Sequence, residues 1–358
     1  MEEARKLKSI LYPLSREVRN LRTFIHNINH ILQAEPQRFA VAAPVGLTSV
    51  RSSVRTLSRA TRAMRETTEV AQQDSAVAAS LAERTRIPLL RPAAQLNALA
   101  RNIRPDVERA ANSVARVEGY LNPLFVFTAA MVPVLDTMQR DIEQVDEQVQ
   151  QFKKAVSRLV DHELTSGLPA EAEQQMSQLA PQFAVIEQET ADIAAQTGLL
   201  MGKMNRLQEL AGRLDVLVRM GAALDASLLD LAPAMTSLKQ LGELLVQVEQ
   251  SHDPLSLSLT EHVDDALASL KLPNDTLLQL ELQLGQHMQQ YIAPVVGPLQ
   301  ELADQLRSRT PNTHELNGLE NGLMSQSVRL GNVTKLLGRL FGHLDQVIAE
   351  TRQSTHAA

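Results

Sequence analysis

Residues 210–245 read LAGRLDVLVRMGAALDASLLDLAPAMTSLKQLGELL, and leucine returns at every seventh position from Leu210 to Leu245. A companion apolar row runs beside it, at Ile186, Ile193, Leu200, Leu207, Leu214, Leu228 and Met235. Apolar rows with heptad spacing are typical of the a and d positions of a coiled coil. A straight α-helix drifts by about 20° per heptad against such a repeat, so the rows stay buried only where the helix packs lengthwise against another helix. The stretch therefore predicts an all-α, elongated antiparallel helical bundle with coiled-coil-like heptad packing.

The same spacing recurs through the rest of the chain. Apolar residues three and four positions apart predict further helices over residues 7–32, 47–84, 96–119, 131–159, 277–291 and 316–347. We expect Pro105 to bend or divide one of these helices and Gly119 to end it, while residues 170–250 form a long rod with kinks at Pro181 and Pro233. Gln326 is the one polar residue in the seam of the last helix. About six to eight long helices that fold back on one another are expected.

Composition restricts the class of protein. The 358 residues contain 44% hydrophobic but only 3% aromatic side chains, with no Trp and no Cys. Small and aliphatic side chains suit narrow helix–helix seams, and the lack of Cys excludes disulfides and thiolate metal sites. The first residues, Met1, Glu2 and Glu3, are not followed by the apolar run of a signal peptide. We expect a cytoplasmic protein, with secretion by another route left open.

Charge is distributed unevenly along the chain. Residues 1–65 hold twelve Lys or Arg against four Asp or Glu, residues 66–120 hold seven of each, and residues 121–358 hold sixteen against thirty. This split predicts an anionic partner for the basic end, or contact between the two ends within one chain or between copies. It also suggests three segments: a basic N-terminal helical segment (1–120), an acidic central rod (121–250) and a C-terminal segment that packs back on the rod (251–358).

The sharpest polar feature lies on the predicted helix 47–84. Arg51, Arg55, Arg59, Arg62 and Arg65 fall on an arc of about 120°, with no acidic residue among them. Such a face can bind an anionic membrane or nucleic acid, although no aromatic side chain lies nearby to stack on bases. Because the counter-charge is already present in the chain, pairing with the protein's own acidic helices or with a neighbouring copy is the favoured interpretation.

Residues 121–135, LNPLFVFTAAMVPVL, are the most apolar run. As a helix they would span about 22 Å, which is short of the roughly 30 Å of a membrane's hydrocarbon core, and they contain two prolines. A complete membrane span is not expected. This is nevertheless the segment that an α-helical pore-forming toxin, or an accessory component of one, would insert. Its membrane-active side chains would be Leu124, Phe125, Val126, Phe127, Met131 and Val132.

Three glycines, Gly331, Gly338 and Gly342, lie opposite the apolar stripe of the last predicted helix. Each costs a helix about 1 kcal/mol relative to Ala, so three on one face suggest a second close helix contact, for example between subunits. Tolerated surface glycines are an equally open interpretation.

No motif of a catalytic or cofactor site is found. Gly198 to Lys203 has only three residues between its glycines, and Met204 stands where a phosphate-binding loop has Ser or Thr. His26 and His30 are four positions apart but lack an evident third metal ligand. We therefore expect no enzyme, cofactor, metal or small-molecule substrate. The expected function is that of a structural or scaffold protein, which self-associates or binds helical partners through its heptad seams and its charge split.

Overall fold

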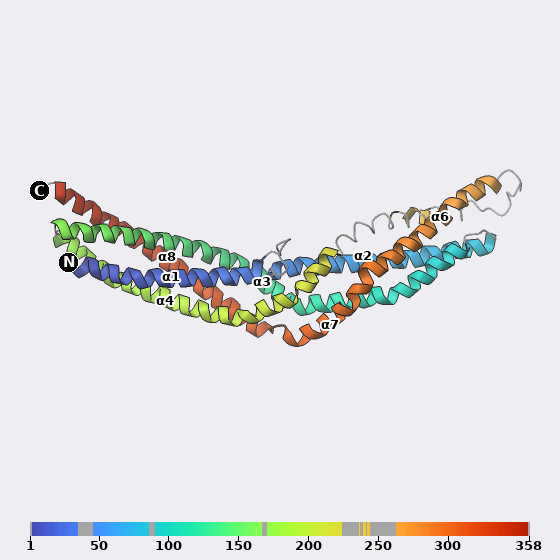
Figure 1. Ribbon diagram of the computed structural model, residues 1–358, viewed down its shortest axis with the longest axis horizontal. Helices are drawn as coiled ribbons and strands as arrows, with labels where there is room; N and C mark the ends of the chain where they lie inside the picture. Colours follow the sequence, from blue (N-terminus) through green and yellow to red (C-terminus); the bar gives the residue numbers. More distant parts are fainter. Residues whose placement is uncertain are drawn as a thin grey trace. The chain divides into compact units, whose positions relative to one another are not determined.

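The computed structural model describes residues 2–34, 46–85, 90–166, 170–223, 236, 239–240, 242–243 and 263–356 (Figure 1). The elements in chain order are α1 (Glu2–Gln33), α2 (Leu47–Thr85), α3 (Leu90–Ser166), α4 (Ala170–Arg213), α6 (Val263–His287), the π-helical turn η1 (Met288–Ile292), α7 (Ala293–Arg309) and α8 (Thr313–His356). The described residues contain no strand. The prediction of an all-α helical bundle is confirmed.

The helices group into two compact units. Unit 1 contains Met1–Ser49, Pro123–Arg213 and Pro311–Ala358, and unit 2 contains Val50–Asn122 and Leu214–Thr310. Each unit combines stretches from all three of the consecutive segments that charge and composition suggest. Helix α3 contributes its first part to unit 2 and its second part to unit 1.

Two pairs of helices in unit 1 run parallel. Helices α1 and α4 lie side by side (Figure 1). Asn27 Nδ2 is 3.9 Å from Met201 Sδ, and the ring of Phe24 lies 3.2 Å from the position of a Cβ on Gly198. Contacts between α3 and α8 also advance in the same direction, from Asp141 near Gly331, through Gln148 near Gly338, to Phe152 against Phe341.

The other two pairs in unit 1 run antiparallel. Helices α1 and α3 meet at Ser15 with Lys153, Arg22 with Asp146 and Gln33 with Asp136. Helices α4 and α8 meet at Glu189 with Arg329, Leu200 with Gly322 and Arg206 with Glu315. Unit 1 is therefore a four-helix bundle in which two helices point each way.

Unit 2 repeats this relation between the early and late parts of the chain. Ser53 and Asp74 of α2 lie against Gly221 and Gly242, and Leu99 and Arg116 of α3 lie against Gly285 of α6 and Asp304 of α7. In both the α2 contacts and the α3 contacts, a higher residue number on one side faces a higher number on the other, so the paired segments run parallel. Within both units, the second half of the chain thus runs parallel to the first half. Long helices that follow one another in the chain run antiparallel.

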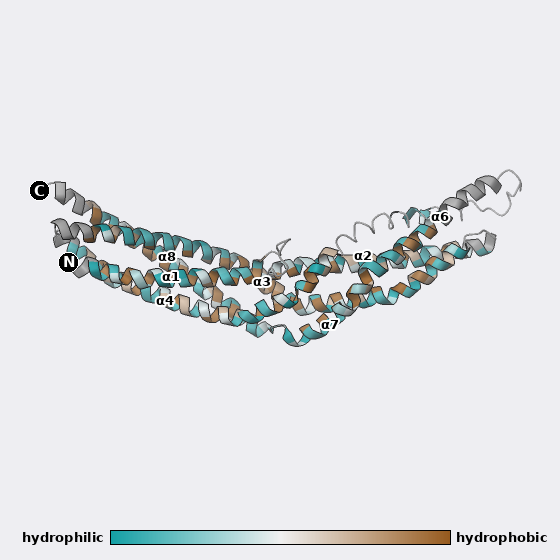
Figure 2. Ribbon diagram, in the orientation of Figure 1, coloured by the Kyte–Doolittle hydropathy of each residue, from teal (hydrophilic) through white to brown (hydrophobic). Residues whose placement is uncertain are grey.

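The predicted apolar seams form the core of both units. Hydrophobic residues recur at helical intervals along the elements and alternate with hydrophilic ones (Figure 2). In unit 1, Phe152 of α3 packs edge-on against Phe183 of α4 and Phe341 of α8, with ring centroids 4.6 and 5.2 Å apart. In α1 the whole predicted stripe is buried: Leu7, Leu11, Leu14, Val18, Leu21, Ile25, Ile28 and Leu32.

Several helix boundaries differ from the prediction, and those of α3 and α4 affect the seams. Helix α3 continues through Pro105 and does not end at Gly119, because buried apolar residues carry its seam onward on both sides of Pro123. Helix α4 ends at Arg213, and the Leu217 N–H bonds the Leu214 carbonyl at 2.9 Å before residues 215–223 continue as helix. Outside the described residues lie Pro233 and the seam positions Leu224, Leu228, Leu231, Met235, Leu238 and Leu245.

Candidate functional site

Helix α2 in unit 2 positions the predicted arginine face. Its apolar stripe, including Val54, Leu57 and Met64, is buried. The buried hydroxyl of Thr61 bonds the carbonyl of Leu57 at 2.9 Å, so that polar group is satisfied inside the stripe. Burial of this stripe fixes the rotation of α2 about its axis and turns the opposite side of the helix outward.

The five predicted arginines lie on that outward side. Arg55, Arg59, Arg62 and Arg65 are exposed, and Arg51 is half-buried. We call Arg51, Arg55, Arg59, Arg62 and Arg65 the basic face. From its first to its last residue the basic face extends for about 21 Å along the helix axis.

Among the described residues, two members of the basic face have side-chain partners. Arg65 Nε is 4.0 Å from Glu69 Oε1, and Arg59 donates a hydrogen bond of 3.3 Å to the hydroxyl of Thr56. Within the part of the chain that the structure describes, Arg51, Arg55 and Arg62 have no carboxylate within ion-pairing distance. Neutralisation of the whole face by the chain's own acidic helices is therefore not found among the described residues.

Carboxylates without a cation partner occur on α3 in unit 1. Asp136, Glu143 and Glu147 are exposed, and among the described residues their carboxylates accept hydrogen bonds only from glutamine amides. We call these three residues the acidic face. Asp146 on the same helix differs, because Arg22 of α1 reaches it at 3.4 Å.

The predicted membrane-active side chains of α3 are mostly in the core. Leu124, Phe125, Phe127 and Met131 are buried, Val132 is half-buried and Val126 is 60% exposed. Among the described helices, the Arg91–Val160 part of α3 is the one with a window long and apolar enough to cross a membrane, and less than half of that window is buried. Core helices of soluble proteins can also be long and apolar enough to meet this criterion.

The three predicted glycines of α8 differ in their surroundings. A Cβ on Gly331 would lie 3.5 Å from Asp141 of α3, and one on Gly338 would lie 3.5 Å from Gln148. A Cβ on Gly342 would meet nothing within 4 Å. These are ordinary contact distances within one chain, so this face of α8 has room for alanine. Closer approaches occur elsewhere, at Gly46 against Ala34, at Gly221 against Ser53 and at Gly322 against Leu200.

A polar cluster between α4 and α8 was missed by the sequence analysis. Arg329 Nε bonds Glu189 Oε1 at 2.6 Å, its Nη1 bonds the amide oxygen of Gln326, and Asp192 lies 3.9 Å away. The hydrogen bond from Arg329 lowers the pKa of Glu189. Gln326 provided the one sequence signal, because a polar residue in an apolar seam requires a partner.

Other titratable groups are dispersed. Burial raises the pKa of Asp74 on α2 and of Asp141 on α3, but these carboxyls belong to different units. His26 and His30 are exposed, with ring centroids 6.4 Å apart. Within the described residues, no group of three or more side chains could hold a metal ion.

The basic face and the acidic face can each bind an oppositely charged surface. Among the described residues, we find no cluster of reactive side chains beside either face. Comparison of the chain with protein-family models, with curated proteins and with solved structures finds no match.

Proposed function

We propose that this protein is a non-enzymatic scaffold that self-associates through its charged helix faces, with coiled-coil-like seams holding its helices together. The observation that carries the proposal is the basic face, because three of its guanidinium groups lack a carboxylate partner among the described residues. The leucine seams of the described helices are buried within each unit and are not available to a partner. Association therefore depends on the charged side chains that remain outside.

A second copy of the chain supplies the complementary surface. Asp136, Glu143 and Glu147 of the acidic face are exposed and have no cation partner in the described residues. A basic patch and an acidic patch on one chain form a heterologous interface, in which the basic face of one copy meets the acidic face of the next. Exposed charge pairs are individually weak and are screened by salt, so such an assembly is expected to be reversible and salt-sensitive.

Light scattering on the full chain tests the proposal. We expect a larger mass at about 20 mM salt than at about 500 mM, because the higher concentration shortens the Debye length to a few ångströms. Reversal of the basic face in Arg55/Arg59/Arg62→Glu should give the smaller mass at both salt concentrations. The matched control is Arg19/Arg158/Arg339→Glu, which makes the same change in net charge at exposed positions outside the basic face.

Charge reversal on both faces gives the sharper outcome. A chain that carries Arg55/Arg59/Arg62→Glu together with Asp136/Glu143/Glu147→Lys has complementary faces again, so its association should return. Mixing the two single-face variants should also produce complexes, although neither associates alone. A wild-type chain that is monomeric at every salt concentration, or a double reversal that fails to restore association while circular dichroism shows a folded helical protein, would overturn the proposal.

The same variants distinguish self-association from another role, that of a peripheral adaptor. Such an adaptor would bind anionic membranes or DNA through the basic face. Binding to phosphatidylserine vesicles or to duplex DNA would be lost in Arg55/Arg59/Arg62→Glu, and reversal of the acidic face would not restore it. That pattern, without self-association, would assign the basic face to a polyanion instead of a second copy.

A pore-forming role is the second candidate, favoured by the apolar window in α3. Four of the six side chains that would enter the membrane are buried: Leu124, Phe125, Phe127 and Met131. Unit 1 would therefore have to open before insertion. Release of dye from liposomes by the wild-type chain, abolished by Val126→Asp at the exposed position, would support this role over the scaffold. An absence of release over the range of concentrations in which the chain associates would exclude it.

A further inference from the structure

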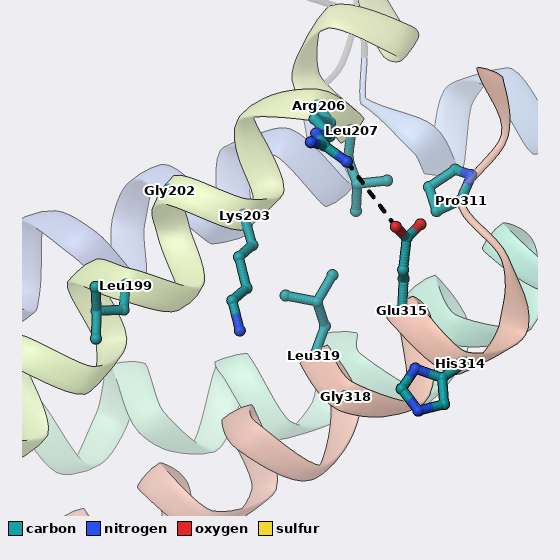
Figure 3. Close-up of a pocket in the computed structure, with 10 residues that line it drawn as sticks. All are labelled: Leu199, Gly202, Lys203, Arg206, Leu207, Pro311, His314, Glu315, Gly318 and Leu319. Carbon is teal, nitrogen blue, oxygen red and sulfur yellow. Dashed lines mark ion pairs between the residues drawn. The ribbon is translucent and has the colours of Figure 1, made fainter.

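We infer that unit 1 contains a binding pocket for a small anionic amphiphile, a molecule with a carboxylate or phosphate group and a short hydrocarbon tail. The pocket has a volume of 610 Å³ and lies between the last turns of α4 and the first turns of α8 (Figure 3). Small-molecule sites in proteins occupy about 300–1,000 Å³ and combine apolar walls with a few polar groups. The inference is independent of the proposed self-association, which uses other surfaces.

The walls of the pocket are apolar. Leu207 and Leu319 are buried at its base, and Pro311 adds an apolar surface from the turn before α8. Leu199 also lines the pocket and is 64% exposed, which is a high exposure for a leucine with apolar neighbours. A hydrocarbon tail that covered Leu199 would remove this apolar surface from water, at a gain of about 25 cal/mol for each Å² buried.

Lys203 supplies the positive charge. Its side chain extends from α4 across the space toward Leu319 of α8 (Figure 3). No carboxylate of the described residues lies within ion-pairing distance of its ammonium group. Lys203 is exposed, so an anion can reach its ammonium group directly from solvent. A charge-assisted hydrogen bond there would add to the burial of a hydrocarbon tail on the apolar walls.

The nearby carboxylate is already engaged. Glu315 Oε2 accepts a hydrogen bond of 3.3 Å from the Asn312 N–H, and the Asn312 side chain accepts one of 2.9 Å from the Glu315 N–H. This reciprocal capping box holds the carboxylate at the start of α8. The other oxygen, Oε1, is 3.9 Å from Arg206 Nη1, so Arg206 offsets the charge of Glu315 and Lys203 remains free for a ligand.

Two glycines leave the walls open. A Cβ on Gly202 or on Gly318 would meet nothing within 4 Å. Neither glycine is therefore required by helix packing, and each costs its helix about 1 kcal/mol relative to Ala. A large side chain at Gly318 would enter the pocket without displacing a helix. The lining also includes Lys203 from the Gly198–Lys203 stretch, which lies within α4 and forms no phosphate-binding loop.

Isothermal titration calorimetry on the full chain, with octanoate and octyl phosphate as probes, tests the pocket. Octanol and octylammonium are the neutral and cationic controls. We expect both anions to bind and both controls to bind at least tenfold more weakly, which corresponds to about 1.4 kcal/mol. The ratio of the two anion affinities identifies the preferred head group.

Three variants locate the binding. Lys203→Met should weaken anion binding by at least about tenfold and leave octanol unchanged, while Lys154→Met, at an exposed lysine of α3 outside the pocket, should have no effect. Gly318→Leu should abolish binding of the anions without lowering the melting temperature, because the new side chain fills open space. Equal binding of octanol and octanoate, unchanged affinity in Lys203→Met, or no binding of either anion by the wild-type chain would overturn the inference.

Discussion

The guanidinium Nε of Arg329 on α8 donates a hydrogen bond of 2.6 Å to the carboxylate Oε1 of Glu189 on α4. This contact joins antiparallel helices from the middle and the end of the chain and lowers the pKa of Glu189. Because the folded-state pKa lies below that of an unfolded Glu, the pair stabilises unit 1 fully above about pH 4.3. The contribution is lost as the pH falls through the folded-state pKa.

Replacement of Glu189 tests this linkage. Glu189→Gln should lower the free energy of unfolding at pH 7 by about 1 kcal/mol or less, because water screens a pair this exposed. Urea titrations at pH 7 and at about pH 2 should show the difference shrinking at the lower pH. Glu209→Gln, at an exposed position of the same helix, serves as the control. If Glu189→Gln lowers the free energy of unfolding by the same amount at both pH values, the pair does not make the pH-dependent contribution assigned to it.

Asp74 on α2 should show the opposite pH dependence. Burial raises the pKa of its carboxyl, so the folded state is penalised as the pH rises through that folded-state pKa. Below the unfolded value of about 3.9 the penalty is absent. Asp74→Asn is therefore expected to raise the melting temperature at pH 7, with a smaller increase at pH 3. Glu66→Gln, at an exposed position on the same helix, controls for the loss of one negative charge, and a lower melting temperature for Asp74→Asn at pH 7 would refute the prediction.

Thr197 and Thr190 form a matched pair on α4. Both side chains are fully buried, but the Thr190 hydroxyl bonds the Ile186 carbonyl at 2.7 Å, whereas the Thr197 hydroxyl has no hydrogen-bond partner among the described residues. A buried hydroxyl without a partner costs about 1–3 kcal/mol. Thr197→Val should therefore raise the free energy of unfolding by about 1 kcal/mol, and Thr190→Val should raise it less or lower it. Equal effects in urea denaturation would show that the hydroxyl of Thr197 finds a partner in solution.

Gly221 is required by a close approach in unit 2. A Cβ at this position would lie 2.9 Å from the Ser53 Cβ and 3.1 Å from the Ser53 Cα, so the two helices would have to separate. Overpacking of this kind costs about 1–3 kcal/mol, which exceeds the gain of about 1 kcal/mol from replacing Gly by Ala in a helix. Gly221→Ala should lower the melting temperature.

Gly297→Ala on α7 is the control for that variant, because its Cβ would meet nothing within 4 Å. It should raise the melting temperature of the same unit. If both alanine variants raise it, the contact between Ser53 and Gly221 is looser in solution than in the structure.

The heptad and three-four spacing was sufficient to predict helices and their buried sides. Leu7 to Leu32 in α1 and Leu316 to Val347 in α8 are buried at the predicted positions. This succeeds because the periodicity of an α-helix is a local property, so residues three and four apart share a face whatever they pack against. The outward position of the arginines of α2 follows from the same geometry.

The tertiary structure alone decided which faces meet. The spacing does not determine that α1 lies parallel to α4, that Ser53 abuts Gly221, or that Arg329 reaches Glu189, because many pairings of similar apolar stripes bury similar area. Seam continuity also carries α3 unbroken past Pro105 and Gly119, where local signals predicted a bend or division and an end. The pocket at Lys203 requires Gly318 and Leu319 from a distant helix, so no local pattern could reveal it. Sequence periodicity specified helices and their faces, and long-range packing selected the partners.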